Sequence, residues 1–192
     1  SLFRALSTAL PYIHPEDKSE PKNRILVPTD FTKVADCAMN HAAGLAERTG
    51  AEINLLHIVA KTADLEEARA KLDLEMERAK RWNDRVKVKQ QLRVGSVYDE
   101  IGNTASEIGA ELIIMGTHGM RGMQFLTGSR ALRVITNSSV PFIVVQERNI
   151  KEDGYSDIVV PMDLQKETRK KVALVADMAK YFDSKVHVIT RR

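Results

Sequence analysis

The sequence predicts an α/β fold built on a parallel sheet, and three observations lead to this class. Short apolar runs and amphipathic helical patterns alternate five times between residues 24 and 146. The first run, at 24–28, is continuously apolar after its arginine, as in a parallel strand buried on both faces. A glycine-rich segment follows the fourth run and precedes a helical pattern, and loops of this kind on rigid scaffolds often carry function.

The first half of this alternation predicts two further strands and two helices. Small apolar residues at helical spacing indicate a helix over 34–48, which Gly50 ends as a left-handed cap. The apolar run at 52–59 predicts a second strand. Residues 64–82 predict a long helix whose charged residues form a solvated face. Apolar and polar residues alternate over 86–94, which is typical of an edge strand.

The second half completes the pattern. A helix is expected to begin at Ser96, a favoured N-cap residue, and to end near residue 108. The apolar run at 111–116 predicts the fourth strand, and a helix over 129–137 follows the glycine-rich segment. A last strand is expected at 141–146, where a proline stands at the tolerated first position.

The segment between Met115 and Ser129 holds four of the ten glycines of the chain. Glycine lets the backbone approach a ligand closely, and a helix that begins at Gly128 and Ser129 offers unpaired N–H groups to an anion. The segment therefore indicates a phosphate or other anion site, or else a connection that merely turns sharply.

This segment resembles the nucleotide-binding signature of the universal stress protein family, Gly116-x-x-Gly119 followed by Gly128-Ser129. Three more stretches resemble the family's first, second and fifth strands: residues 25–32, 55–59 and 140–145. The resemblance implies a doubly wound five-stranded parallel sheet in the order 3-2-1-4-5, with helices on both faces. In that order the chain direction reverses between the first and fourth strands, where ligands of open α/β sheets bind.

The resemblance also implies ATP or another adenine nucleotide as the ligand. The implied nucleotide-binding residues are Pro28, Thr29, Asp30, Ile58, Met115, Gly116, Gly119, Gly128 and Ser129. The loop from Gly119 to Gly128 is one residue shorter than in ATP-binding members, which favours an anion near Gly119, Gly128 and Ser129 over tight ATP binding. Asp30 is expected to accept hydrogen bonds from ribose hydroxyls, to form an Asx-turn before the next helix, or both.

Two histidines and three arginines have weaker claims to a role. His118 is expected to order the glycine loop by a hydrogen bond, and His57, in an apolar strand, is interpreted as a satisfied core residue. Arg121, Arg130 and Arg133 follow the glycines and either pair with phosphate or are solvated. The sequence offers no catalytic residue and no metal cluster that we would select.

Composition excludes several classes. A net charge of +3, without a run of five like charges, does not favour nucleic acid. No apolar run approaches the roughly 20 residues of a membrane span, so no membrane partner is expected. Cys37 is the single cysteine, which fits a reducing cytoplasm and a small buried side chain.

Two functions remain in competition. The first is a stress-response module that binds a nucleotide or anion without strong catalysis, with weak ATP hydrolysis at most. The second is an interaction scaffold that binds no nucleotide, which the shortened loop favours. In either case, the apolar strand at 141–146 is expected to pair antiparallel across a two-fold axis, in a homodimer or with a second domain. A phosphate-ester hydrolase is the weakest reading, because no general base is apparent.

The end of the chain repeats its beginning. Residues 158–163 realign with residues 25–30 at an offset of 133, and the offset continues through the next helix and strand. We therefore expect a partial second β-α-β unit of the same family, which stops before its glycine loop and docks on the first domain or a partner chain. The expected division is an N-terminal extension at 1–21 with a short amphipathic helix, a first domain at 22–148, a linker at 149–155 and the partial second domain at 156–192.

Overall fold

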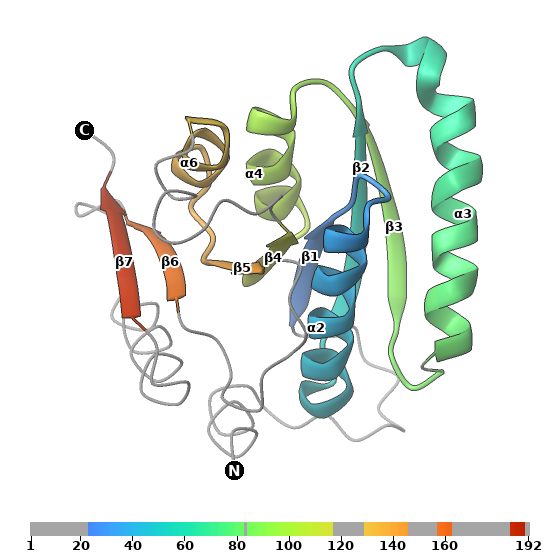
Figure 1. Cartoon of the computed structure of the whole chain (residues 1–192), viewed down its shortest axis with the longest axis horizontal. Helices are drawn as coiled ribbons and strands as arrows, with labels where there is room; N and C mark the ends of the chain where they lie inside the picture. Colours follow the sequence, from blue (N-terminus) through green and yellow to red (C-terminus); the bar gives the residue numbers. More distant parts are fainter. Residues whose placement is uncertain (1–22, 83, 117–128, 146–156, 163–184, 191–192) are drawn as a thin grey trace.

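The protein is an α/β structure around one sheet in a computed structural model that describes residues 23–82, 84–116, 129–145, 157–162 and 185–190 (Figure 1). Seven strands lie in the order β3-β2-β1-β4-β5-β6-β7. The first five pair in parallel in the predicted order 3-2-1-4-5, so the predicted fold class is confirmed. The predicted helix in the extension at 1–21 lies outside the described residues.

The strands begin and end close to their predicted positions. Their bounds are β1 Arg24–Pro28, β2 Glu52–Val59, β3 Val88–Val94, β4 Leu112–Gly116, β5 Phe142–Val145, β6 Asp157–Met162 and β7 Lys185–Thr190. The prediction for β3 was wrong by two residues at its start. Lys87 still accepts a hydrogen bond from the backbone N–H of Ile53, at 2.9 Å, but regular pairing begins with Ile53 opposite Val88.

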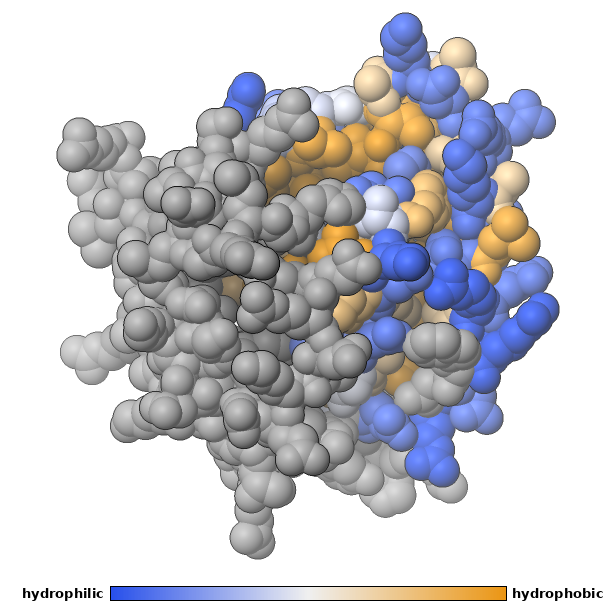
Figure 2. Space-filling view, viewed as in Figure 1, coloured by the Kyte–Doolittle hydropathy of each residue, from blue (hydrophilic) through white to orange (hydrophobic). Residues whose placement is uncertain are grey.

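Within the described residues, four α-helices connect strands of the sheet, and a short 3-10 turn precedes one of them. Their bounds are α2 Lys33–Thr49, η1 Thr62–Asp64, α3 Leu65–Trp82, α4 Val97–Glu107 and α6 Ser129–Thr136. Gly50 ends α2 with φ +71°, in the predicted left-handed cap. The surface over α3 is mostly hydrophilic, as its charged sequence predicts (Figure 2). No helix within the described part of the chain is long and apolar enough to cross a bilayer.

Two hydrophobic clusters form because side chains of a strand alternate between the faces of the sheet. On one face, Ile25 and Val27 of β1 pack with Ala38 and Ala42 of α2 and with Leu72 of α3. Full burial of a larger aliphatic side chain such as Val27 or Leu72 contributes about 1.5–3 kcal/mol to stability.

The opposite face carries the second cluster. Leu26 of β1 packs there with Ala105 of α4, Ile135 of α6 and Phe142 of β5. Helices therefore cover both faces of the sheet (Figure 1), as a doubly wound fold requires, because its two sets of crossovers run in opposite directions.

A charged cluster joins the amino-terminal ends of three strands. Glu52 of β2 is 1% exposed, and its carboxylate lies 3.4 Å from Arg24 Nε of β1. Lys87 Nζ and Lys89 Nζ lie 3.2 and 3.3 Å from its other oxygen. Asn54 donates a hydrogen bond at 3.1 Å to Oε1, the Glu52 oxygen that faces Arg24. Burial opposes the ionisation of Glu52, but Asn54 and the two lysines hold its pKa below the ordinary 4.5.

The last two described strands extend the sheet beyond β5. β6 pairs antiparallel with β5, Phe142 opposite Val159 and Ile143 opposite Ile158. β7 pairs parallel with β6 over six residues. The antiparallel pair β5–β6 therefore forms within one chain, and it involves β5, the strand that was predicted to take part in association.

Candidate functional site

The candidate site lies at the neighbouring carboxyl ends of β1 and β4. β1 pairs with β2 on one side and with β4 on the other. The chain leaves β1 through α2 toward β2, whereas it leaves β4 toward α6 and β5, in the opposite direction across the sheet. This reversal is the switch point beyond which ligands of such folds bind.

The turn after β1 is fixed by a hydrogen bond within the turn and by another to β2. Pro28, the last residue of β1, and Thr29 are half-buried, whereas Asp30 is exposed. The N–H of Thr29 donates to the carbonyl of Leu56 at 2.8 Å, and its hydroxyl accepts from the N–H of Phe31 at 3.0 Å. The turn therefore has a fixed path that places Asp30 at the rim of the sheet.

Asp30 makes the local bonds expected of an Asx-turn. Its Oδ1 accepts from the N–H of Thr32 at 3.2 Å and also from the Thr32 hydroxyl. Thr32 then serves as the N-cap of α2. These bonds orient the carboxylate without burying it, so its turn role is compatible with a role toward a ligand.

Gly116 lets the end of β4 approach the first turn of α2. A Cβ built on Gly116 would lie 2.5 Å from the carbonyl oxygen of Val34 and 2.9 Å from its Cγ2. Real Cβ atoms do not approach backbone oxygen so closely, so any larger residue would push β4 and α2 apart. Glycine here is a packing requirement, in addition to the ligand contact that the sequence suggests.

Two predicted site residues lie on the α4/α6 face of the sheet. Met115 of β4 is buried in the second cluster, and half-buried Ile58 near the end of β2 packs against the same cluster. The structure thus brings β1, β2 and β4 residues to one end of the sheet, with apolar side chains on the α4/α6 side.

The phosphate half of the predicted site is less described. Gly119, Gly128 and His118 lie outside the described residues. Ser129 is the first residue of α6, as the sequence predicts, but its side chain lies outside the description. The roles of these residues toward phosphate stay predictions.

Arg133 packs against a neighbouring helix. Its guanidinium carbon lies 4.4 Å from the centre of the Tyr98 ring, so it links α6 to α4. Asn137 strengthens the same contact by donating to the carbonyl of Tyr98 and to Asp99 Oδ1, each at 3.1 Å. Arg121 and the side chain of Arg130 lie outside the described residues, so their two readings stay open.

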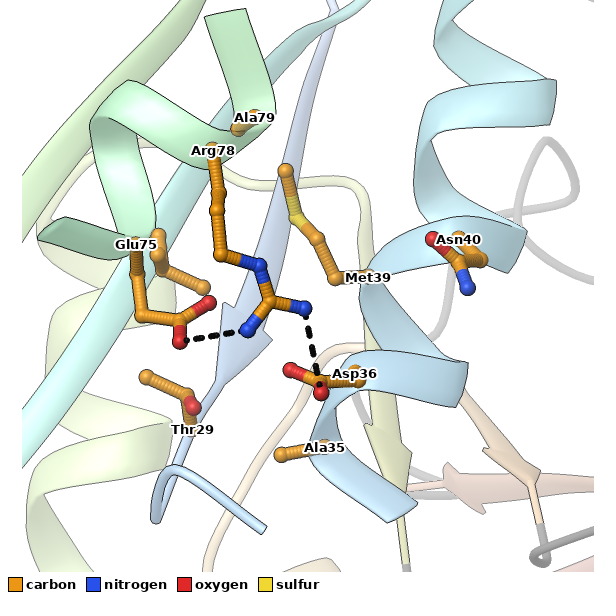
Figure 3. Close-up of a pocket in the computed structure, with 9 residues that line it drawn as sticks. Thr29, Ala35, Asp36, Met39, Asn40, Glu75, Arg78 and Ala79 are labelled. Carbon is orange, nitrogen blue, oxygen red and sulfur yellow. Dashed lines mark hydrogen bonds and ion pairs between the residues drawn. The ribbon is translucent and has the colours of Figure 1, made fainter. Parts of the chain in front are cut away.

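A small hollow lies behind the turn, between α2 and α3 (Figure 3). Thr29 lines it, and Arg78 of α3 bridges Asp36 and Glu75 at 3.3 and 3.2 Å. Burial raises the pKa of Glu75; Arg78 lowers it and Asp36 raises it. A volume of about 30 Å³ suits one or two waters, so this hollow is no nucleotide site.

Among the described residues, no acidic, histidine or cysteine side chains gather as a metal cluster.

His57 was interpreted from the sequence as a satisfied core residue, and its contact with the β1–α2 turn was not predicted. It is half-buried, and its Nδ1 lies 2.8 Å from the carbonyl oxygen of Thr29. Its ring contacts that of Phe31, with centroids 4.4 Å apart. The sequence alone carries no signal for this contact, because it depends on the offset of 28 between paired residues of β1 and β2, which places His57 across from Thr29.

The family now follows from more than motif resemblance. A model described as the Universal stress protein family matches residues 22–146, which include the switch point, the turn and the glycine segment. The chain belongs to the universal stress protein family.

Known universal stress proteins share both sequence and fold with the chain. Universal stress protein G of Shigella flexneri is 32% identical over 139 residues, covering 64% of this chain and 97% of that protein. Universal stress protein MJ0577 of Methanocaldococcus jannaschii is 31% identical over 155 residues, covering 66% and 96%. The solved MJ0577 structure covers 68% of this chain and 100% of its own, with a TM-score of 0.50.

A universal stress protein from Archaeoglobus fulgidus has been solved in complex with dAMP. It is 23% identical, covers 65% of this chain and 98% of its own, and has a TM-score of 0.54. At this identity the likeness shows a common fold. The bound dAMP is a property of that relative.

Proposed function

We propose that the chain is a universal stress protein module that binds an adenine nucleotide or a related anion at the switch point, without strong catalysis. The observation that carries the proposal is the exposed Asp30 on a fixed turn, next to the β4 end that Gly116 packs against α2. The dAMP complex of the Archaeoglobus fulgidus relative supports the choice of ligand class.

Each part of the site has a chemical role in this proposal. The Asp30 carboxylate accepts hydrogen bonds from ribose hydroxyls, and the strand ends at Ile58 and Met115 face the base. Gly119, Gly128 and Ser129 supply backbone N–H groups to phosphate at the start of α6. In this proposal the module binds its ligand without breaking or forming a bond in it, and no residue serves as a general base or a metal ligand.

The test is calorimetric titration of the full chain with AMP, dAMP and ATP. We expect AMP to bind, and Asp30→Ala to weaken it by roughly ten-fold or more, because bonds to a charged group are worth about 1.5–3 kcal/mol. Asp64→Ala is the matched control, since Asp64 is an exposed carboxylate in η1. ATP is expected to bind no more tightly than AMP, because the shortened loop displaces the phosphate donors.

Two results would contradict this proposal. An affinity for all three nucleotides that is undetectable at millimolar concentration would remove the ligand. An Asp30→Ala variant that binds AMP as tightly as the Asp64→Ala variant would show that the site lies elsewhere.

The second candidate is an interaction scaffold, and the extended sheet favours it. Self-association through the strand at 141–146 is part of this candidate, as a homodimer or as a pair with a second domain. The antiparallel ladder of Phe142 and Ile143 with β6 supports the view that this strand pairs readily in that direction. Light scattering with and without AMP tests the homodimer form of this candidate, which is expected to have the mass of a dimer in both conditions.

A tandem arrangement is a further part of the proposal, and the register of the last two strands supports it. Asp157 lies opposite Lys185 and Ile158 opposite Val186. Moved back by 133 residues, these pairs coincide with Arg24 opposite Glu52 and Ile25 opposite Ile53. The matching register of β6 and β7 supports the proposal that residues 156–192 form a second β-α-β opening.

A further inference from the structure

His57 connects the second strand to the turn that carries Asp30. A carbonyl oxygen only accepts hydrogen bonds, so the 2.8 Å contact between His57 Nδ1 and Thr29 O requires a proton on Nδ1. The preceding β2 residue, Leu56, accepts the N–H of Thr29 at 2.8 Å. Leu56 and His57 of β2 therefore bind the N–H and the carbonyl of Thr29. Leu56 does so with its backbone carbonyl and His57 with its side chain.

The residue after Asp30 has a backbone conformation that needs support. Phe31 has φ +62°, in the left-handed region that bulky residues rarely adopt. Such a conformation persists only where surrounding contacts hold it. The His57 ring supplies one such contact, at 4.4 Å between centroids and an interplanar angle of 41°, and Thr29 Oγ1 supplies another, by accepting the N–H of Phe31 at 3.0 Å.

Asp30 thus lies between two residues that His57 restrains. Thr29 on one side receives the imidazole hydrogen bond, and Phe31 on the other side packs its ring against the same imidazole. The side chain of Asp30 is exposed and accepts a hydrogen bond from the N–H of Thr32, a residue of the same turn. The contacts of His57 with Thr29 and Phe31 therefore restrain the backbone from which the Asp30 carboxylate extends.

We propose that His57 is a positioning residue for ligand binding: it fixes the β1–α2 turn so that Asp30 points at the nucleoside. The proposal rests on the proposed function for its ligand. It assigns the two neighbouring residues of β2 to different tasks. Ile58 packs on the α4/α6 side of the sheet, whereas His57 restrains the turn.

Three variants of the full chain test the proposal. His57→Leu keeps similar bulk but removes the donor, whereas His57→Asn keeps an N–H donor near the place of Nδ1. His41→Leu, on α2, is the control for loss of a half-buried histidine away from the turn. We expect His57→Leu to weaken AMP binding roughly five-fold to ten-fold, and His57→Asn to restore it to within about two-fold of the parent. His41→Leu is expected to bind AMP like the parent.

Amide exchange of Phe31 and Thr32 gives a readout that needs no ligand. We expect faster exchange in His57→Leu and parent-like exchange in His57→Asn. Imidazole nitrogen shifts should report the Nδ1–H tautomer of His57. Equal AMP affinity in the parent and in His57→Leu, or an Nε2–H tautomer, would overturn the positioning role.

The two proposals fail separately. If the parent binds no nucleotide, the proposed function fails, and the role of His57 in ligand binding fails with it. Unchanged amide exchange in His57→Leu would separately overturn the claim that His57 restrains the turn. If the parent binds AMP and His57→Asn does not rescue the loss seen in His57→Leu, the donor role of His57 is wrong and the nucleotide site stands.

Discussion

Gly116 and Gly44 differ in the space that surrounds them for an added side chain. A Cβ on Gly116 would meet the Val34 carbonyl oxygen at 2.5 Å, whereas a Cβ on Gly44 of α2 meets nothing within 4 Å. We expect Gly116→Ala to lower the free energy of unfolding by about 1–3 kcal/mol through overpacking. Gly44→Ala should raise it by roughly 0.5–1 kcal/mol, because alanine favours the helix.

Urea denaturation of both variants measures these changes, and the AMP affinity of folded Gly116→Ala measures the effect on the site. We expect weaker binding, because the alanine separates β4 from the α2 turn that follows Asp30. A Gly116→Ala variant as stable as Gly44→Ala would show that the contact with Val34 yields without cost.

Residue identities predicted part of the candidate site. Asp30 and Gly116 were chosen from motifs, and the sheet brings their strand ends together because β1 and β4 are neighbours. The role of His57 was not predicted, because a histidine in an apolar strand looks like any core residue until the β1–β2 register is known. Arg133 could not be assigned either, since its contact with Tyr98 depends on how α4 and α6 pack.

At the scale of elements, Glu52 acts as a clamp across three strands. Its carboxylate contacts Arg24 of β1 as well as Lys87 and Lys89, which lie just before and within β3. The folded pKa lies below 4.5, so this stabilisation is fully present above pH 4.5 and is lost as the pH falls through the lower folded value. We expect Glu52→Gln to cost about 1–3 kcal/mol near pH 7, and the difference from the parent to shrink below pH 4.5.

Urea denaturation at neutral and acidic pH measures this difference. Glu67→Gln is the control, because Glu67 is exposed and pairs only along its own helix with Lys71 at 2.7 Å, a kind of pair that contributes little. A constant stability gap between Glu52→Gln and the parent at every pH would contradict the clamp.

The bounds of elements were predicted well where the hydrophobic periodicity agrees with a residue that favours the start or end of the element. β1 and β2 match their predicted residues, and α4 begins after Ser96, whose hydroxyl accepts from the N–H of Tyr98 at 3.2 Å. β3 was predicted to begin too early because the apolar Val86 continues the alternation of the strand in sequence, although pairing begins at Val88. The sheet order itself came from family resemblance, since alternation alone does not fix which strands are neighbours.

At the scale of the whole molecule, the ladder between β5 and β6 has a kinetic consequence for association. Phe142 and Ile143 already pair with Val159 and Ile158 of the same chain. A second copy can therefore reach this edge of β5 only after β6 has departed, so dimerisation there requires the release of β6. Mixing two differently labelled samples should give mixed dimers slowly, at a rate set by strand release and independent of protein concentration. Complete mixing within seconds would mean that the copies meet through another surface.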